Sequence, residues 1–186
     1  MEHAMGDITS EYWKPVMEKI QLAFKEGLYN KVKGVDVYRM YVRYKYVIYI
    51  AYVAAKDVEE QFTVFGWVLL KHPKPKWKSF EVSQSYVFKE VRGEGWAKLI
   101  YSTIINVEKL TLVSGDSQTK DGKKLWVGLV KSDRFHIWAH DLQNLKIRAE
   151  VHYDEETDSL WSPLKIYDDN ESWKADVRLI AIKKEK

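Results

Sequence analysis

The chain has 186 residues, 46% of them hydrophobic and 14% aromatic, which is long enough to bury a core and predicts one globular domain. It contains no cysteine, which excludes disulfides, a thiolate nucleophile and a cysteine-type zinc site. The net charge of +3 does not by itself indicate a nucleic-acid-binding protein. No run of about 18 apolar residues and no secretory leader is found, so we expect a cytoplasmic protein with no membrane partner.

The first predicted element is a helix that begins after Met5. Residues 1–4 precede this second methionine and are typical of a cloning remnant, so residues 5–186 are expected to form the domain. Thr9 or Ser10 is a suitable N-cap, and Pro15 falls near the first turn. Apolar residues then recur at helical spacing: Trp13, Val16, Met17, Ile20 and Phe24.

From Val35 onward the composition changes to that of strands. Residues 37–44, 46–54 and 62–70 are rich in Val, Ile, Tyr and Phe, and their short connections predict antiparallel hairpins. Residues 71–78 carry four lysines, two prolines and Trp77, which indicates a solvated basic turn or, alternatively, a contact for nucleic acid or an acidic partner. A fourth strand is predicted over residues 79–87.

The most informative stretch follows directly, from Val87 to Leu99. Two glycines, Gly93 and Gly95, separate the end of a strand from the start of a helix. Backbone N–H groups at such a helix start, together with glycines that leave room for close approach, suit a phosphate ligand. Neither the Rossmann glycine pattern nor a P-loop is present, so the ligand is not assigned to either class.

Downstream of this turn the pattern predicts a parallel strand pair. Apolar residues on one face of the next helix are Trp96, Leu99, Ile100, Thr103, Ile104 and Val107. Residues 110–113 read as a short buried strand, and a strand-helix-strand unit is normally parallel. The whole is therefore an α/β (α+β) fold with a mixed, mostly antiparallel central sheet flanked by helices.

The segment Arg92-x-x-Gly95-x-Ala97, with Val87 five residues before the arginine, resembles the acetyl-CoA loop of the GNAT N-acetyltransferase superfamily, whose pattern is Q/R-x-x-G-x-G/A. The order of the predicted elements is also similar to that family. The resemblance implies acetyl-CoA as acyl donor, with pantetheine entering beside the strand that ends at Val87. Its cofactor-binding residues here would be Val87, Arg92, Gly93, Glu94, Gly95, Trp96, Ala97 and Lys98. A carboxylate at Glu94 would repel a pyrophosphate, which favours a surface role for that side chain.

A second segment matches the family in spacing and not in its main residues. Thr119-x-x-Gly122-x-x-Leu125-Trp126 stands where the family has N-x-x-A-x-x-L/F-Y, before a predicted helix over residues 125–130. In many members the tyrosine of that motif protonates the departing thiolate, and the indole of Trp126 cannot do so. Either Trp126 is structural, which we favour, or catalysis here needs no such acid.

Glu81 is the catalytic residue that the resemblance suggests. It lies eleven residues before Arg92, where some members of the family carry a general base for the acceptor amine. The alternative is a solvated glutamate on the polar side of a strand.

The C-terminal part predicts further strands and no metal site. His136 and His140 lie in an alternating, strand-like segment, where residues four apart are some 13 Å distant. Residues 145–153 and 160–167 read as two strands around an acidic turn, and residues 177–182 as a closing strand. We therefore expect a core over 5–135 and a C-terminal strand extension over 136–186.

This extension, with the run from Val113 to Trp126, is similar to divergent GNAT-like proteins encoded by bacteriophages. That similarity places the protein in the host cytoplasm and implies a host or phage component, protein or nucleic acid, as acceptor. Two functions stay open: an acyl-CoA-dependent N-acyltransferase, which the glycine turn favours, and a catalytically inactive GNAT-fold protein that inhibits or modulates a host protein or nucleic-acid complex, which Trp126 favours.

Overall fold

The computed structural model describes most of the chain, namely residues 10–59, 61–71, 79–115, 120–132, 134–141, 148–157, 159–164, 166 and 177–184. The predicted cloning remnant, the Thr9 cap, most of the basic turn over 72–78 and Thr119 of the second motif lie outside the described residues. By internal contacts the chain divides into two compact units, one of Met1–His72 with Gln84–Thr103 and one of Pro73–Ser83 with Ile104–Lys186. The single-domain prediction stays a prediction.

The first unit is an antiparallel meander with a helix on each face. Its strands are β1 (Tyr29–Lys31), β2 (Val37–Tyr44), β3 (Val47–Val58) and β4 (Gln61–Lys71), followed by the later half of β5 (Phe80–Val87). Its helices are α1 (Ser10–Lys25), the short 3-10 turn Lys89–Val91 and α2 (Trp96–Ser102). The predicted helix and long strands are confirmed, and the short strand β1 is an element that the sequence pattern did not indicate.

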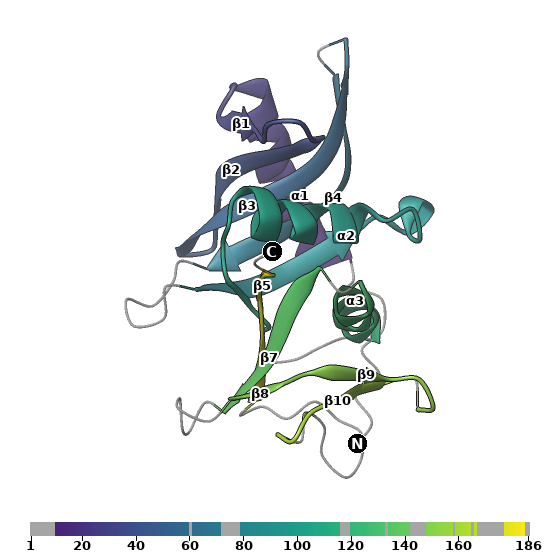
Figure 1. Ribbon diagram of the computed structural model, residues 1–186. Coiled ribbons are helices and arrows are strands. Elements are labelled where there is room, and N and C mark those ends of the chain that lie inside the picture. Colours follow the sequence, from purple (N-terminus) through teal and green to yellow (C-terminus); the bar gives the residue numbers. More distant parts are fainter. Residues whose placement is uncertain are drawn as a thin grey trace. The chain divides into compact units, whose positions relative to one another are not determined.

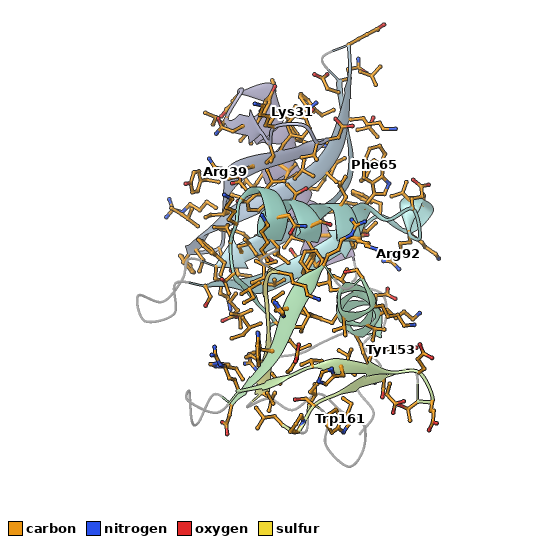
Figure 2. All side chains as sticks on the ribbon, in the orientation of Figure 1. Lys31, Arg39, Phe65, Arg92, Tyr153 and Trp161 are labelled. Carbon is orange, nitrogen blue, oxygen red and sulfur yellow. The ribbon has the colours of Figure 1, made fainter. Side chains whose placement is uncertain are left out.

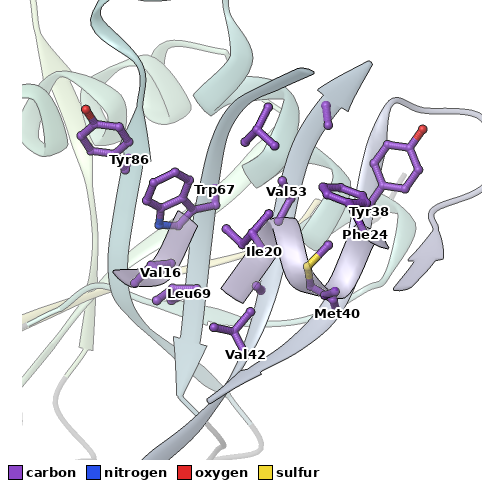
Figure 3. Packing of buried hydrophobic residues seen from close by; sticks show 14 residues of the cluster. Val16, Ile20, Phe24, Tyr38, Met40, Val42, Val53, Trp67, Leu69 and Tyr86 are labelled. Atoms are coloured by element: carbon purple, nitrogen blue, oxygen red, sulfur yellow. The ribbon is translucent and has the colours of Figure 1, made fainter. Parts of the chain in front are cut away.

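Helix α1 packs on one face of this meander because its apolar residues lie on a single side. Val16 and Ile20 are fully buried, and they contact the residues of β2 to β4 that alternate toward α1 (Figure 3), among them Met40 and Trp67. The Trp67 indole donates a hydrogen bond to Gln84 Oε1 at 3.4 Å, so its only polar group has a partner. Helix α2 covers the opposite face (Figure 1), where it buries Ile100 and Tyr101.

A bulge interrupts the pairing of β3 with β4 next to the predicted glycine turn. Ala54 lies opposite Gly66 and Ala55 opposite Val64, so Phe65 is an extra residue of β4 with no counterpart in β3. The Phe65 carbonyl instead accepts a hydrogen bond from the Phe88 N–H at 3.0 Å. The bulge residue Phe65 is therefore hydrogen-bonded to Phe88, which directly follows β5.

The second unit contains the one parallel strand pair among the pairings of described residues. Its sheet has the order β5-β6-β11-β7-β8, in which β6 is Leu112–Val113, β7 is Phe135–Asp141, β8 is Arg148–Glu150 and β11 is Val177–Lys183. Phe80 and Glu81 pair in parallel with Leu112 and Val113, and the remaining pairings are antiparallel. Helix α3 (Lys120–Lys131) packs on β7, and β9 (His152–Asp154) with β10 (Ser159–Trp161) forms a separate hairpin. The mixed, mostly antiparallel α/β fold is confirmed.

Three details differ from the sequence-based expectation. The helix after the glycine turn widens into a π-helical turn over Thr103–Val107, which leaves Val107 45% exposed instead of on the buried face. The described residues of the expected strand over 145–153 form two strands, because Val151 separates β8, which pairs with β7, from β9, which pairs with β10. The closing strand β11 lies between β6 and β7 and thus inside the sheet, a position that local sequence pattern does not reveal.

Candidate functional site

The glycine turn between β5 and α2 has the conformation that its sequence predicts. Gly93 and Gly95 both have φ of 89°, a left-handed conformation that other residues rarely adopt. A Cβ built on either glycine would meet nothing within 4 Å. The turn therefore requires glycine for its backbone path, and the space around it is open.

The amides at the start of α2 have no partners within the helix. The first intrahelical bond runs from the Leu99 N–H to the Gly95 carbonyl at 2.9 Å, so the N–H groups of Trp96, Ala97 and Lys98 come before the hydrogen-bond ladder. Gly95 and Lys98 are exposed, and Ala97 is half-buried. Free amides beside an exposed ammonium group suit an anionic ligand.

Arg92 directly precedes Gly93 and bonds back to the end of β5. Its Nε donates a hydrogen bond to the Val87 carbonyl oxygen at 3.1 Å, which joins the end of β5 to the residue before Gly93 (Figure 2). The guanidinium group is exposed, so its terminal nitrogens lie at the surface of the turn. The structure thus gives Arg92 a positioning role in addition to the phosphate contact that the resemblance implies, and it gives the Val87 carbonyl a partner within the chain.

Trp96 is held against the bulge of β4. Its ring stacks on Phe65 with centroids 4.2 Å apart and planes 10° apart, and its Nε1 donates to Glu94 Oε2 at 3.0 Å. Lys56 Nζ lies 5.9 Å from the centroid of each ring. Glu94 therefore fixes the Trp96 ring, which supports a structural role for this carboxylate instead of contact with a phosphate.

The sequence did not indicate three residues that support the turn. A Cβ on Gly66 would lie 2.4 Å from the Tyr86 carbonyl oxygen, so this glycine permits the close approach of β4 and the end of β5. Phe65, the extra residue of the bulge, stacks on Trp96, and Lys56 lies beside both rings. An isolated glycine inside the predicted strand 62–70 was the available signal, since such glycines mark bulges or close backbone contacts.

Glu81 and Trp126 belong to the other unit. Glu81 pairs with Val113 in the parallel ladder and is half-buried, with partners of its own. Trp126 is 1% exposed on α3, so its indole is part of the hydrophobic core, in agreement with the structural role that we favoured. Both residues therefore lie in the second unit, and the glycine turn lies in the first.

The remaining candidates give no further catalytic group. β7 confirms the strand through His136 and His140, and His136 Nδ1 lies 4.0 Å from Glu150 Oε1. Among the described residues, no three His, Asp or Glu side chains are grouped closely enough to hold a metal ion. Within the same part of the chain, every helix is too short or too polar to cross a membrane.

Comparison with known proteins gives two distant likenesses in structure. No family model and no curated protein sequence matches the chain. An IAA acetyltransferase from Bacillus cereus is 16% identical, with a TM-score of 0.38, over 73% of this chain and 78% of that one. A protein from Bacteroides thetaiotaomicron assigned to the acetyltransferases of the GNAT family is 9% identical, with a TM-score of 0.40, over 95% of this chain and 82% of that one. At these identities and TM-scores, neither likeness assigns a family or an activity to this chain.

Proposed function

We propose that this chain is an acyl-CoA-dependent N-acyltransferase of GNAT-like fold that transfers an acetyl group from acetyl-CoA to an amine. The observation that carries the proposal is the turn Arg92 to Lys98, in which two left-handed glycines with open space around them lead into the first amides of α2, which have no partner within the helix. A pyrophosphate is the ligand that such a turn suits best, because it offers several acceptor oxygens to several donors at once.

In this proposal the residues of the turn bind the pyrophosphate of the coenzyme, and Glu81 accepts a proton from the acceptor amine. The amides of Trp96, Ala97 and Lys98 would donate to the pyrophosphate, and the exposed Lys98 would supply a positive charge. The amine, once deprotonated by the Glu81 carboxylate directly or through water, would attack the thioester carbonyl, and the C–S bond would break as the amide forms. The departing thiolate would take its proton from solvent, since Trp126 is buried and carries no acidic hydrogen.

A catalytically inactive GNAT-fold binding protein is the second candidate. The buried Trp126 favours it, because the residue that protonates the thiolate in many members of the family is absent at that position. In this alternative the chain would inhibit or modulate a host protein or a nucleic-acid complex, as the similarity to bacteriophage-encoded proteins suggests. The acceptor in the first proposal would come from the same range of host or phage components.

The two candidates are separated by ligand-induced stabilisation followed by turnover. Coenzyme A or acetyl-CoA at a hundredfold excess over its Kd would stabilise a binding chain by about 2.7 kcal/mol, and 1 kcal/mol corresponds to roughly 2–4 °C in a protein of this size. No shift in melting temperature at millimolar ligand contradicts coenzyme A binding in any form. A shift without release of free thiol in the presence of an amine panel favours the inactive binding protein.

Glu81 is tested in the same assay. Glu81→Gln is expected to slow thiol release roughly 100-fold or more while the shift with coenzyme A is unchanged, since a general base contributes about 100- to 10,000-fold. Glu90→Gln is the matched control, because Glu90 is an exposed carboxylate beside the turn and should turn over normally. Equal rates for the two variants would remove Glu81 from the mechanism.

A further inference from the structure

The hairpin of β2 and β3 carries a basic and aromatic surface that the proposed acyltransferase does not use. From Val37 to Lys56 the chain contains four cations, six tyrosines and no acidic residue. The four cations are Arg39, Arg43, Lys45 and Lys56. This segment therefore carries a charge of +4, which is more than the net charge of +3 of the whole chain.

Part of this surface lies on the face of β2 that is turned away from α1. Met40 and Val42 are buried in the core with α1, and Tyr41 and Arg43 alternate with them along the strand. Tyr41 is 65% exposed, and Arg43 is exposed as well. Arg39, labelled in Figure 2, is half-buried and alternates onto the same side of β2 as Tyr41 and Arg43, so the Cα atoms of these three residues follow one another at steps of about 7 Å.

The tip and the opposing strand extend this surface. Tyr46, in the turn, is 96% exposed, and Ile48, which pairs with Arg43, is 54% exposed. Lys45 Nζ lies 5.4 Å from the centroid of the Tyr44 ring and remains exposed. Exposed apolar side chains that adjoin one another on a surface are typical of interaction sites.

We propose that the exposed face of this hairpin, formed by Arg39, Tyr41, Arg43, Lys45 and Tyr46, binds single-stranded nucleic acid. Exposed rings provide stacking surfaces for bases, and the cations on either side of Tyr41 and beside Tyr46 lie where the phosphates of the same strand would pass. Such a surface would bind with little sequence preference, since stacking and phosphate contacts are common to all nucleotides.

Charge argues against a second copy of the chain as the occupant. An isologous contact through this face would bring its cations against the same cations of the other copy, with no acid between Val37 and Lys56 to compensate them. The position of Tyr41 argues against a lipid surface. Tyr41 lies within β2, away from the tip of the hairpin, and the tip residue Tyr46 would enter a bilayer first. A single strand can follow the strand direction and contact both tyrosines.

The test is fluorescence anisotropy with labelled oligothymidylate and oligouridylate of about 16 nucleotides, measured between about 50 mM and 200 mM salt. We expect binding that weakens with salt. Tyr41→Ala should lower the affinity roughly 5- to 150-fold, and Tyr41→Phe should retain it, because the ring and not the hydroxyl stacks. Arg43→Gln should weaken binding and reduce the slope of log K against log salt by about 0.7, the value for one phosphate contact on a single strand.

Two substitutions elsewhere serve as controls. Trp161→Ala removes an aromatic side chain that is 56% exposed on β10, and Lys19→Gln removes an exposed cation of α1. Both variants should bind as the original chain does, with an unchanged salt slope. Since all these side chains are exposed, each variant is expected to keep its far-ultraviolet circular dichroism spectrum.

Several results would overturn the proposal. One is no binding to either oligonucleotide at low salt, and another is equal loss of affinity in Trp161→Ala and Tyr41→Ala. Equal binding to polyglutamate would show a surface for acidic proteins, and binding to phosphatidylserine vesicles without binding to oligonucleotides would show a membrane surface. Dimerisation that Tyr41→Ala abolishes would assign the hairpin to a contact between two copies.

Discussion

Gly66 lies against the end of β5, and Gly95 lies just before α2. The two positions require glycine for different reasons. At Gly66 a Cβ would lie 2.4 Å from the Tyr86 carbonyl oxygen and 3.1 Å from the Val87 Cα, so no space is left for a side chain. At Gly95 the space is open and the φ of 89° is what favours glycine. One position is constrained by packing and the other by backbone conformation.

This difference separates the stability of the scaffold from the binding capacity of the turn. Gly66 determines how closely β4 approaches the end of β5, and Gly95 determines how the amides of α2 are presented. Substitutions at the two positions should therefore fail in different assays.

Gly66→Ala should destabilise the chain most. The contact is with a backbone carbonyl, which cannot turn aside as a flexible side chain can, so we expect a loss of about 3 kcal/mol, at the upper end of the range for overpacking. In a protein of this size that is roughly a 6–12 °C lower melting temperature, which circular dichroism would measure. The matched control is Gly128→Ala in α3, where a Cβ would meet nothing within 4 Å.

The control should change stability in the opposite direction. Alanine is favoured over glycine by about 1 kcal/mol inside a helix, so Gly128→Ala is expected to raise the melting temperature slightly. If Gly66→Ala were as stable as the original chain, the close approach of β4 to Tyr86 would be wrong.

Gly95→Ala should cost less stability and more binding. A left-handed alanine costs about 1–2 kcal/mol, and the reorientation of the first amides of α2 should abolish the melting-temperature shift with coenzyme A. Gly34→Ala is the control, because Gly34 also has a positive φ, 81°, and open space around it. The two variants should lose similar stability, and only Gly34→Ala should keep the melting-temperature shift with coenzyme A. A shift that survives in Gly95→Ala would place the ligand elsewhere.

Trp96→Ala should have a smaller effect. It removes the stack on Phe65, and an aromatic pair of this kind contributes about 0.5–1.5 kcal/mol beyond burial. Trp96→Phe keeps a ring for the stack and loses only the bond to Glu94, so urea denaturation should show a smaller loss of unfolding free energy. If the phenylalanine variant were as unstable as the alanine variant, the bond to Glu94 and not the stack would hold the turn.

Tyr101, on the buried side of α2, should affect stability only at alkaline pH. Burial raises the pKa of the Tyr101 phenol well above its ordinary value of 10.0, and a hydrogen bond with Ser85 only partly offsets this. The unfolded chain loses this proton above about pH 10 while the folded chain keeps it, so stability should fall as the pH rises from there. Tyr101→Phe should make the unfolding free energy less dependent on pH in that range; an unchanged dependence would contradict a buried, neutral phenol.

Local pattern was sufficient to predict much of the fold. Val16 and Ile20 at helical spacing, alternating residues such as Met40 and Val42, and the strand-helix-strand order after Val87 each correspond to an observed element. These features depend on neighbours in sequence, which one chain displays fully. The left-handed glycines of the turn were predictable for the same reason.

Features that depend on partners distant in sequence were not predictable. Phe65 reaches Trp96 through a bulge that exists only because β3 and β4 pair in a particular register, and the sequence of β4 alone does not specify that register. The bond from Arg92 to the Val87 carbonyl requires the conformation of the finished turn. The exposure of Tyr41 and Tyr46 also depends on which strands and helices the fold leaves uncovered.

The place of β11 between β6 and β7 has a consequence for the synthesis of the chain on the ribosome. Thirty-five residues separate the end of β7 at Asp141 from the start of β11 at Val177. At about 5–20 residues per second, the edge of β7 that β11 will occupy remains open for roughly 2–7 seconds during translation, and the edge of β6 remains open longer. All residues of the first unit precede Ile104, so they are already synthesised while β6 and β7 still present two strand edges to which another nascent chain or a chaperone can bind.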